Sequence, residues 1–194
     1  MTKKIFFIYL LVLFACKSEK PKEKYSAPGK NDVNEIIRTI IREDSLNKKK
    51  YPLSADLVKI TVSLKDATMP ARRRFDTMNV KRLLGRGHDG QYFFSKRDSV
   101  YFLFQNAAIK SLKLDSPFLK IMTLMSNAQL QQNEKSDPLF RHYDLSLPIF
   151  SLDRKKAVVE FNYYCKFCGF GMLIYLERIN GKWEIIKQEE TWVS

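Results

Sequence analysis

The sequence predicts an α+β domain in which an N-terminal helix and further short helices pack on an antiparallel sheet that closes with a C-terminal β-meander. Three patterns predict this class: helical spacing of apolar residues in 32–48, alternation in 57–64, and strand segments separated by turn residues in 157–193. Helices that come first and consecutive strands that follow are typical of α+β domains.

The first helix is predicted over 32–48. Asp32 and Glu35 are spaced like an N-terminal capping pair, and Pro52 prevents the helix from continuing. We therefore expect a helix that buries one face against the sheet. Its apolar stripe is formed by Val33, Ile36, Ile37, Ile40 and Ile41.

The middle of the chain is less regular. Alternating residues predict a half-buried strand over 57–64, and a helix is expected over 72–84. In 95–109 a Ser-x-x-Asp pair favours a helix, although an uninterrupted apolar run there leaves a strand open. A further helix is predicted within 117–130, followed by a polar loop over 129–138.

The last third of the chain predicts strands. An extended segment over 140–150 precedes strands over 157–164, 170–179 and 182–193. The Asn-Gly pair at 180–181 tolerates positive φ and favours a two-residue hairpin turn between the last two strands.

The N-terminus has the features of an export signal. Lys3 and Lys4 precede an apolar run over 5–15, which as a helix would cover about 16 Å of a ~30 Å hydrocarbon core. The run is therefore too short to span a membrane comfortably and has the length of a signal-peptide core.

The run ends in Leu-Phe-Ala-Cys, which resembles the lipobox of bacterial lipoproteins with its cysteine at Cys16. The resemblance implies that the Cys16 sulfur carries a diacylglycerol and that residues 1–15 are a signal peptide removed from the mature protein. An ordinary secretory signal or a short anchor helix is the alternative.

The same resemblance predicts organisation and location. Residues 16–31 would be the lipidated cysteine and a lysine-rich flexible tether, and residues 32–194 one folded domain. The implied partner is a membrane, held through the lipid anchor. Lys17 resembles no inner-membrane retention signal, which favours the outer membrane of the cell envelope.

The chain is basic, with a formal net charge of +13. After export the available partners are anionic ligands such as acidic glycans or lipids, and other envelope proteins, whereas nucleic acid is not expected. Solubility alone also accounts for a basic surface. No motif implies a cofactor.

The segment from about residue 148 to residue 192 resembles uncharacterised small bacterial envelope lipoproteins. In outline its hairpins are also similar to the closing hairpins of nuclear-transport-factor-like cone folds. That second likeness concerns the fold and carries no activity.

Cys165 and Cys168 form a Cys-x-x-Cys pair, which in an exported protein predicts a disulfide that braces a turn. Reduced core thiols, a redox-active pair and a metal site are the alternatives. A thioredoxin-type thiol needs a helix N-terminus, whereas the following residues predict a strand, and zinc needs two further ligands. The pair is flanked by Tyr163, Tyr164, Phe167 and Phe170, candidates for a pocket rim, a partner surface or plain core.

The remaining candidates for ligand binding are two histidines and one basic cluster. His88 lies in a glycine-rich loop over 85–90, which is either a functional loop or a surface turn, and His142 stands alone. The basic cluster, suited to anionic groups or simply a solvated face, is formed by Arg72, Arg73 and Arg74.

Together these patterns predict a membrane-anchored envelope lipoprotein that acts as a binding or interaction module. The alternative is an envelope enzyme with thiol–disulfide activity at Cys165 and Cys168. No catalytic residue and no metal ligand is assigned, because the sequence contains no spaced nucleophile motif. Enzymatic activity stays open, with binding as the favoured hypothesis.

Overall fold

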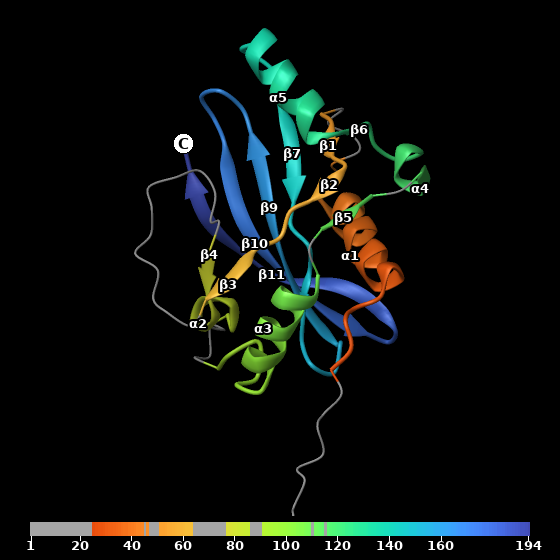
Figure 1. Ribbon diagram of the computed structural model, residues 1–194, viewed down its shortest axis with the longest axis vertical. Coiled ribbons are helices and arrows are strands. Elements are labelled where there is room, and N and C mark those ends of the chain that lie inside the picture. The colour runs from red at the N-terminus through yellow and green to blue at the C-terminus, as the bar shows by residue number, and fades with distance from the viewer. Residues whose placement is uncertain are drawn as a thin grey trace, which may run out of the picture.

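The computed structural model describes residues 25–44, 46, 51–63, 77–85, 91–109, 111–114 and 116–194 (Figure 1). Within these ranges the chain forms helices and a mixed sheet that ends in an antiparallel meander, which confirms the predicted α+β class. The helices are α1 (Lys30–Glu43), α2 (Val80–Leu83), α3 (Asp98–Ala108), α4 (Ser116–Leu119) and α5 (Asn127–Ser136).

The main sheet has seven strands in the order β11-β10-β9-β7-β1-β6, with β8 paired to β9 beside this path. Its members are β1 (Leu53–Ser54), β6 (Leu124–Met125), β7 (His142–Leu145), β8 (Ile149–Phe150), β9 (Lys156–Tyr164), β10 (Phe170–Ile179) and β11 (Lys182–Val193). Two short pairs lie outside it: β2 (Asp56–Leu57) with β5 (Leu112–Lys113), and β3 (Thr61–Ser63) with β4 (Thr77–Asn79).

The sheet is antiparallel from β7 to β11, as the sequence predicts, but β1 runs parallel to both β6 and β7. The sheet is therefore mixed rather than wholly antiparallel. Residue periodicity cannot reveal this difference, because the direction of a neighbouring strand is set by the long connection between them.

The meander has the predicted register. Val159, Phe161 and Tyr163 share one face of β9, and the hairpin between β10 and β11 turns at Asn180 and Gly181. Both turn residues have positive φ, 51° and 80°, the conformation that the Asn-Gly pair tolerates.

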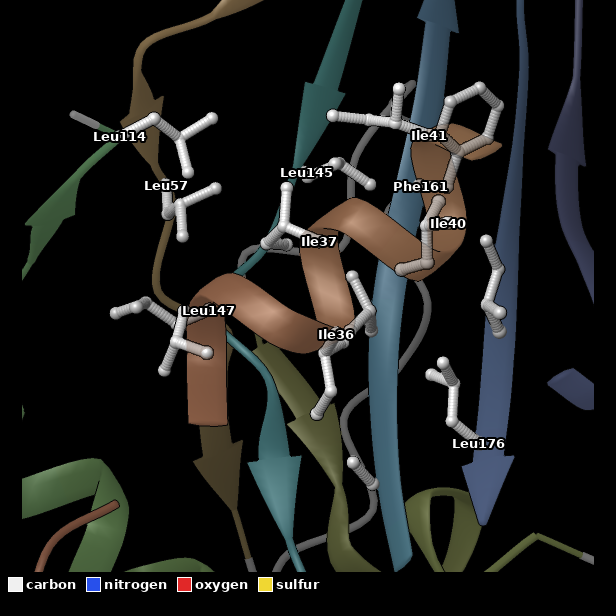
Figure 2. Close-up of a cluster of buried hydrophobic side chains, with 14 of the residues drawn as sticks. Ile36, Ile37, Ile40, Ile41, Leu57, Leu114, Leu145, Leu147, Phe161 and Leu176 are labelled. Atoms are coloured by element: carbon white, nitrogen blue, oxygen red, sulfur yellow. The ribbon is translucent and has the colours of Figure 1, made fainter. Parts of the chain in front are cut away.

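Helix α1 buries its isoleucine stripe against one face of this sheet. Ile36, Ile37 and Ile40 are fully buried, and Figure 2 shows the stripe over Leu145 and Phe161. Each such side chain contributes about 1.5–3 kcal/mol on leaving water, so this face is a main source of stability.

The N-terminus of α1 differs from the prediction. The helix begins at Lys30, and its cap residue Gly29 makes no side-chain capping bond. Asp32 and Glu35 are instead ion-paired with Arg178 of β10, at 3.4 and 2.7 Å. The predicted capping pair therefore serves as a contact between helix and sheet, because the Arg178 cation outcompetes a backbone N–H as a partner.

Tyr25 and Ser26, the first described residues, contact α3 and the turn before β9. The Tyr25 ring packs beside Phe104 and Tyr101 of α3, and the Tyr101 hydroxyl donates to the Ser26 carbonyl at 2.7 Å. Arg154 also donates to the carbonyl of Ser26. An aromatic ring in this otherwise polar segment thus packs against an apolar surface of the helix.

The other sheet face is covered by α2, the small pair of β3 and β4, and Phe102 of α3, whereas Tyr101 of the same helix belongs to the first cluster. Residues of β9 and β10 that alternate with the α1-facing ones, such as Val158 and Tyr175, enter this second core. It also contains Met78, Leu83, Phe94 and Phe102. The sheet therefore lies between two apolar clusters.

Several central elements differ from the sequence predictions. The expected strand over 57–64 is divided between β2 and β3, and the described part of the expected helix over 72–84 is β4 followed by α2. The residues over 95–109 form helix α3, as the Ser-x-x-Asp pair favours. The expected loop over 129–138 is largely helix α5, because Ser126 and Gln129 form a capping box that the sequence analysis overlooked.

Candidate ligand-binding site

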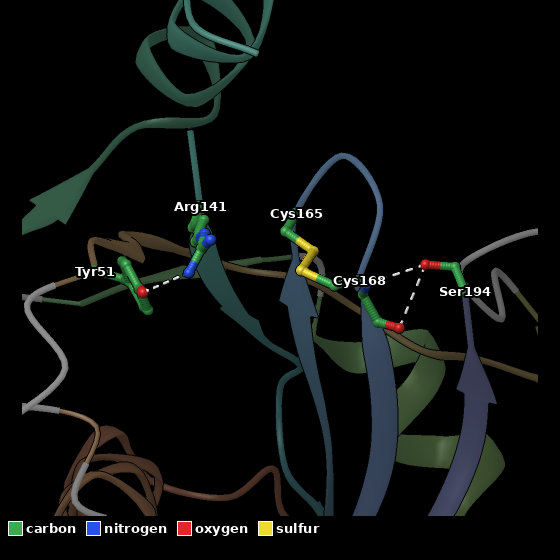
Figure 3. Close-up of a disulfide and its surroundings, with 6 residues drawn as sticks. Tyr51, Arg141, Cys165, Cys168 and Ser194 are labelled. Carbon is green, nitrogen blue, oxygen red and sulfur yellow. Dashed lines mark hydrogen bonds between the residues drawn. A yellow bond between two sulfur atoms is a disulfide. The ribbon is translucent and has the colours of Figure 1, made fainter. Parts of the chain in front are cut away.

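The Cys-x-x-Cys pair forms a disulfide in the connection between β9 and β10. Cys165 and Cys168 have Cα atoms 5.4 Å apart, and Figure 3 shows the bridge beside the C-terminal Ser194. The predicted disulfide is confirmed. Cys165 is buried and Cys168 is exposed, and neither stands at the start of a helix, which is where a thioredoxin-type thiol would be activated.

His142 is buried on the sheet face away from α1. Its ring stacks between Phe140 and Tyr164, with centroids 5.8 and 4.9 Å away, and its Nδ1 lies 3.7 Å from a Glu134 oxygen. Burial lowers the pKa of His142 to about 4, so the imidazole is neutral near neutral pH. In this setting the histidine acts as a packed aromatic ring.

The other predicted site residues cannot be placed. Cys16, His88 and the arginine cluster at 72–74 lie outside the described residues. Among the residues that the structure describes, no group of three His, Cys, Asp or Glu side chains is arranged to hold a metal ion.

A pocket of about 250 Å³ opens where the C-terminal end of α1 meets the sheet. Alternate residues of β7, β9 and β10 supply its floor, because they project from the sheet face that also carries α1. Asp44 and Leu46, which follow α1, and Tyr51, which precedes β1, complete the lining. The lining residues are Asp44, Leu46, Tyr51, Tyr143, Phe161, Tyr163, Phe170 and Met172.

Three tyrosines form one side of this tyrosine pocket, and their rings are tilted rather than stacked. Tyr51 lies 5.8 Å from Tyr143 with an interplanar angle of 61°, and 5.9 Å from Tyr163 at 36°. Tyr143 and Tyr163 lie 5.6 Å apart at 39°. Phe170 extends the aromatic surface beyond Tyr163, with ring centroids 5.6 Å apart.

Arg141 holds the outer tyrosine in position. Its guanidinium donates to the Tyr51 hydroxyl at 2.9 Å and lies 5.6 Å from the centre of the same ring (Figure 3). The guanidinium is exposed and is not among the residues that line the pocket. Arg141 therefore orients Tyr51 from the solvent side.

Tyr143 lines the site with a buried ring and a buried hydroxyl. The residue is 2% exposed, and among the described residues its hydroxyl has no hydrogen-bond partner. Burial raises the pKa of Tyr143 to about 12, helped by the nearby Tyr163 and Tyr51 hydroxyls, so the phenol stays protonated. It can therefore both donate and accept a hydrogen bond.

Asp44 adds a negative charge to the lining. It follows the last residue of α1, and its Oδ1 accepts a hydrogen bond from Gln188 Nε2 at 3.1 Å. The C-terminal end of a helix carries a partial negative charge of its own.

Sequence reasoning found part of this site. Tyr163 and Phe170 were candidates for a pocket rim and do line the pocket, whereas Tyr164 stacks on His142 and Phe167 is 78% exposed. Tyr51 and Tyr143 were missed, because nothing in the sequence places residues so far apart along the chain next to each other.

Comparison with family models, curated proteins and solved structures yields no match to this chain. The site must therefore be interpreted from its own geometry. Among the described residues, no helix has both the length and the apolar character needed to cross a membrane.

Proposed function

We propose that this protein is an envelope lipoprotein anchored through Cys16, and that its folded domain is a binding module that takes a small ligand in the tyrosine pocket. The observation that carries the second part is the buried Tyr143 hydroxyl without a protein partner in an aromatic cavity. The lipobox-like sequence supports the first part.

The composition of the pocket supports binding of a small molecule. Ligand sites are mostly apolar and aromatic, with a few placed polar groups, and commonly enclose about 300–1,000 Å³. The tyrosine pocket, at about 250 Å³, is slightly smaller and has this composition. An unsatisfied buried hydroxyl costs about 1–3 kcal/mol, and a ligand that bonds to it removes that cost.

The proposal is tested by screening the soluble domain against a panel of small neutral, cationic and anionic compounds by NMR. We expect a ligand whose binding perturbs the resonances of Tyr51, Tyr143 and Tyr163. Tyr143→Phe, which removes only the hydroxyl, should raise the dissociation constant of that ligand about five- to tenfold. This factor corresponds to roughly the free energy of one buried hydrogen bond.

The same variant should be no less stable than the wild type, because it removes an unpaired polar group. Tyr92→Phe is the matched control, since Tyr92 is 42% exposed and lies outside the pocket. If no compound in the panel perturbs the three tyrosines, or if Tyr143→Phe binds every hit as well as Tyr92→Phe does, the pocket is not the functional site.

A further inference from the structure

We propose that the protein has a second binding site, a groove between helix α5 and the neighbouring ends of β7 and β9, and that this groove takes a carbohydrate chain. The α5 groove consists of two cavities of about 280 Å³ each, lined by residues within 127–144 and 164–166, and the two cavities share Glu134 and Tyr164. None of these described lining residues belongs to the tyrosine pocket. The inference therefore goes beyond the proposed function and does not depend on it.

The wall that α5 contributes to the groove is polar. Asn127, Gln131 and Glu134 are four and three residues apart, so they lie on one face of the helix, and all three line the groove. A helix that only packs against a sheet turns an apolar stripe toward it, whereas α5 buries only Leu130. The side of α5 that faces the groove thus presents amide and carboxylate groups to it.

The opposite wall is aromatic. Phe140, His142 and Tyr164 line the groove and form a row of stacked rings, in which the His142 centroid is 5.8 Å from that of Phe140 and 4.9 Å from that of Tyr164. Trp192 follows Tyr164 at 5.8 Å. Phe140 is the other end of the row, and this half-buried ring lines the groove. The row therefore gives the groove a rigid apolar side.

A polar wall opposite an aromatic one fits a sugar ring. A pyranose has an apolar face of C–H groups that packs on aromatic side chains, and hydroxyls around its edge that each donate and accept a hydrogen bond. Glu134 and Asp137 can accept such bonds, Lys135 can donate them, and the Gln131 amide can do both. Because charges of both signs line the groove, the fit does not depend on the charge of the ligand.

The extent and the position of the groove favour a chain over a single sugar. Two cavities that meet at Glu134 and Tyr164 offer places for consecutive units of one chain. In Figure 1 helix α5 is at one end of the molecule and the red segment of residues 25–29 is toward the other. With the anchor proposed at Cys16, the groove would be remote from the membrane, where envelope polysaccharides are accessible.

The test measures binding of four tetrasaccharides to the full chain in detergent by calorimetry. The probes are chitotetraose, maltotetraose, xylotetraose and mannotetraose, each compared with its monosaccharide, and tetraglycine serves as the peptide probe. We expect at least one tetrasaccharide to bind about ten times more tightly than its monosaccharide, because only the longer chain reaches both cavities. Tetraglycine should not bind, because it has no apolar ring face for the aromatic wall.

Two variants locate the sugar. Gln131→Ala should weaken the tetrasaccharide about three- to fivefold, the effect of one hydrogen bond, whereas Gln132→Ala, the matched control, should not, because this neighbour on the same helix is exposed and lies outside the groove. Phe140→Leu, which keeps an apolar side chain but removes the ring face, should weaken it about three- to tenfold. Both glutamines are exposed, so neither change threatens the fold.

The results separate this inference from the proposed function. It is overturned if no tetrasaccharide binds, if tetraglycine occupies the groove in place of every sugar, or if Gln131→Ala and Gln132→Ala bind the sugar equally well. Tyr143→Phe should leave sugar binding unchanged, because Tyr143 lines the other site. The tyrosine pocket is judged by its own ligand, so either proposal can fail while the other stands.

Discussion

At the scale of single residues, neighbours on one strand have opposite roles. His142 and Tyr143 are consecutive in β7, so their side chains project from opposite faces of the sheet. His142 enters a stack of rings, and Tyr143 enters the pocket. The isolated histidine was a reasonable candidate by residue type, but it is the tyrosine beside it that lines the aromatic pocket.

The buried histidine predicts a dependence of stability on pH. Its pKa is about 4 in the folded protein and 6.5 as an unperturbed group, so between these values the unfolded chain binds a proton that the folded chain does not. The free energy of unfolding should therefore decrease as pH falls from about 6.5 to about 4. We expect a loss of about 2 kcal/mol, because the nearby Glu134 carboxylate favours the protonated imidazole and so reduces the effect of burial.

Urea unfolding at about pH 7 and about pH 4.5 measures this effect. His142→Phe retains the ring stack and cannot titrate, so it should lose about 2 kcal/mol less stability over that interval than the wild type. Equal losses in the two proteins would show that His142 does not remain neutral in the fold.

At the scale of elements, local sequence patterns predicted the correct secondary structure where an element buries a single apolar face. The isoleucine stripe of α1 and the alternation in β9 both have a single apolar face, and both are as predicted. Helix α5 buries only Leu130, so it lacks an apolar stripe, and its capping box at Ser126 was the signal for it. A capping pair can also misplace the start of a helix: α1 begins at Lys30, and Asp32 and Glu35 form ion pairs with Arg178.

The hairpin between β9 and β10 gives a prediction about the disulfide. The bridge encloses four residues, a loop for which chain entropy accounts for about 2 kcal/mol. The Cys165→Ser, Cys168→Ser double variant should lose about that much stability and still bind the pocket ligand, because neither cysteine lines the tyrosine pocket.

Thiol titration of protein purified from its native cell distinguishes a bracing role from a redox role. We expect no free thiol before reductant, two after it, and no turnover of a dithiol substrate. Free thiols in the protein as isolated, or rapid cycling with a mild reductant, would instead support the envelope-enzyme alternative.

At the scale of the whole molecule, the pocket and the N-terminal segment lie at opposite ends of α1. Tyr25 precedes the first turn of this helix and Asp44 follows the last, and 14 residues of helix span about 21 Å. In Figure 1 the red segment of residues 25–29 leads into the end at which α1 begins. An anchor at Cys16 would therefore attach to the end of α1 that is remote from the pocket.

The anchor itself is tested by the mass and the location of the mature protein. We expect protein purified from its native cell to begin at Cys16, to carry added acyl groups and to sediment with membranes. Cys16→Ser should remain in the precursor form without lipid, whereas Cys165→Ser should not change the attachment. An intact leader with no added fatty acid would overturn the envelope proposal.

The sequence by itself determined the class of the fold, the burial face of α1, the hairpin at Asn180 and the disulfide between Cys165 and Cys168. These features depend on residues close together in the chain, whose spacing fixes which side chains share a face. Only the tertiary structure decided the parallel pairing of β1 and the composition of the pocket. Tyr51, Tyr143 and Tyr163 belong to three separate segments, and their meeting follows from strand order and long connections, which leave no periodic signal in the sequence.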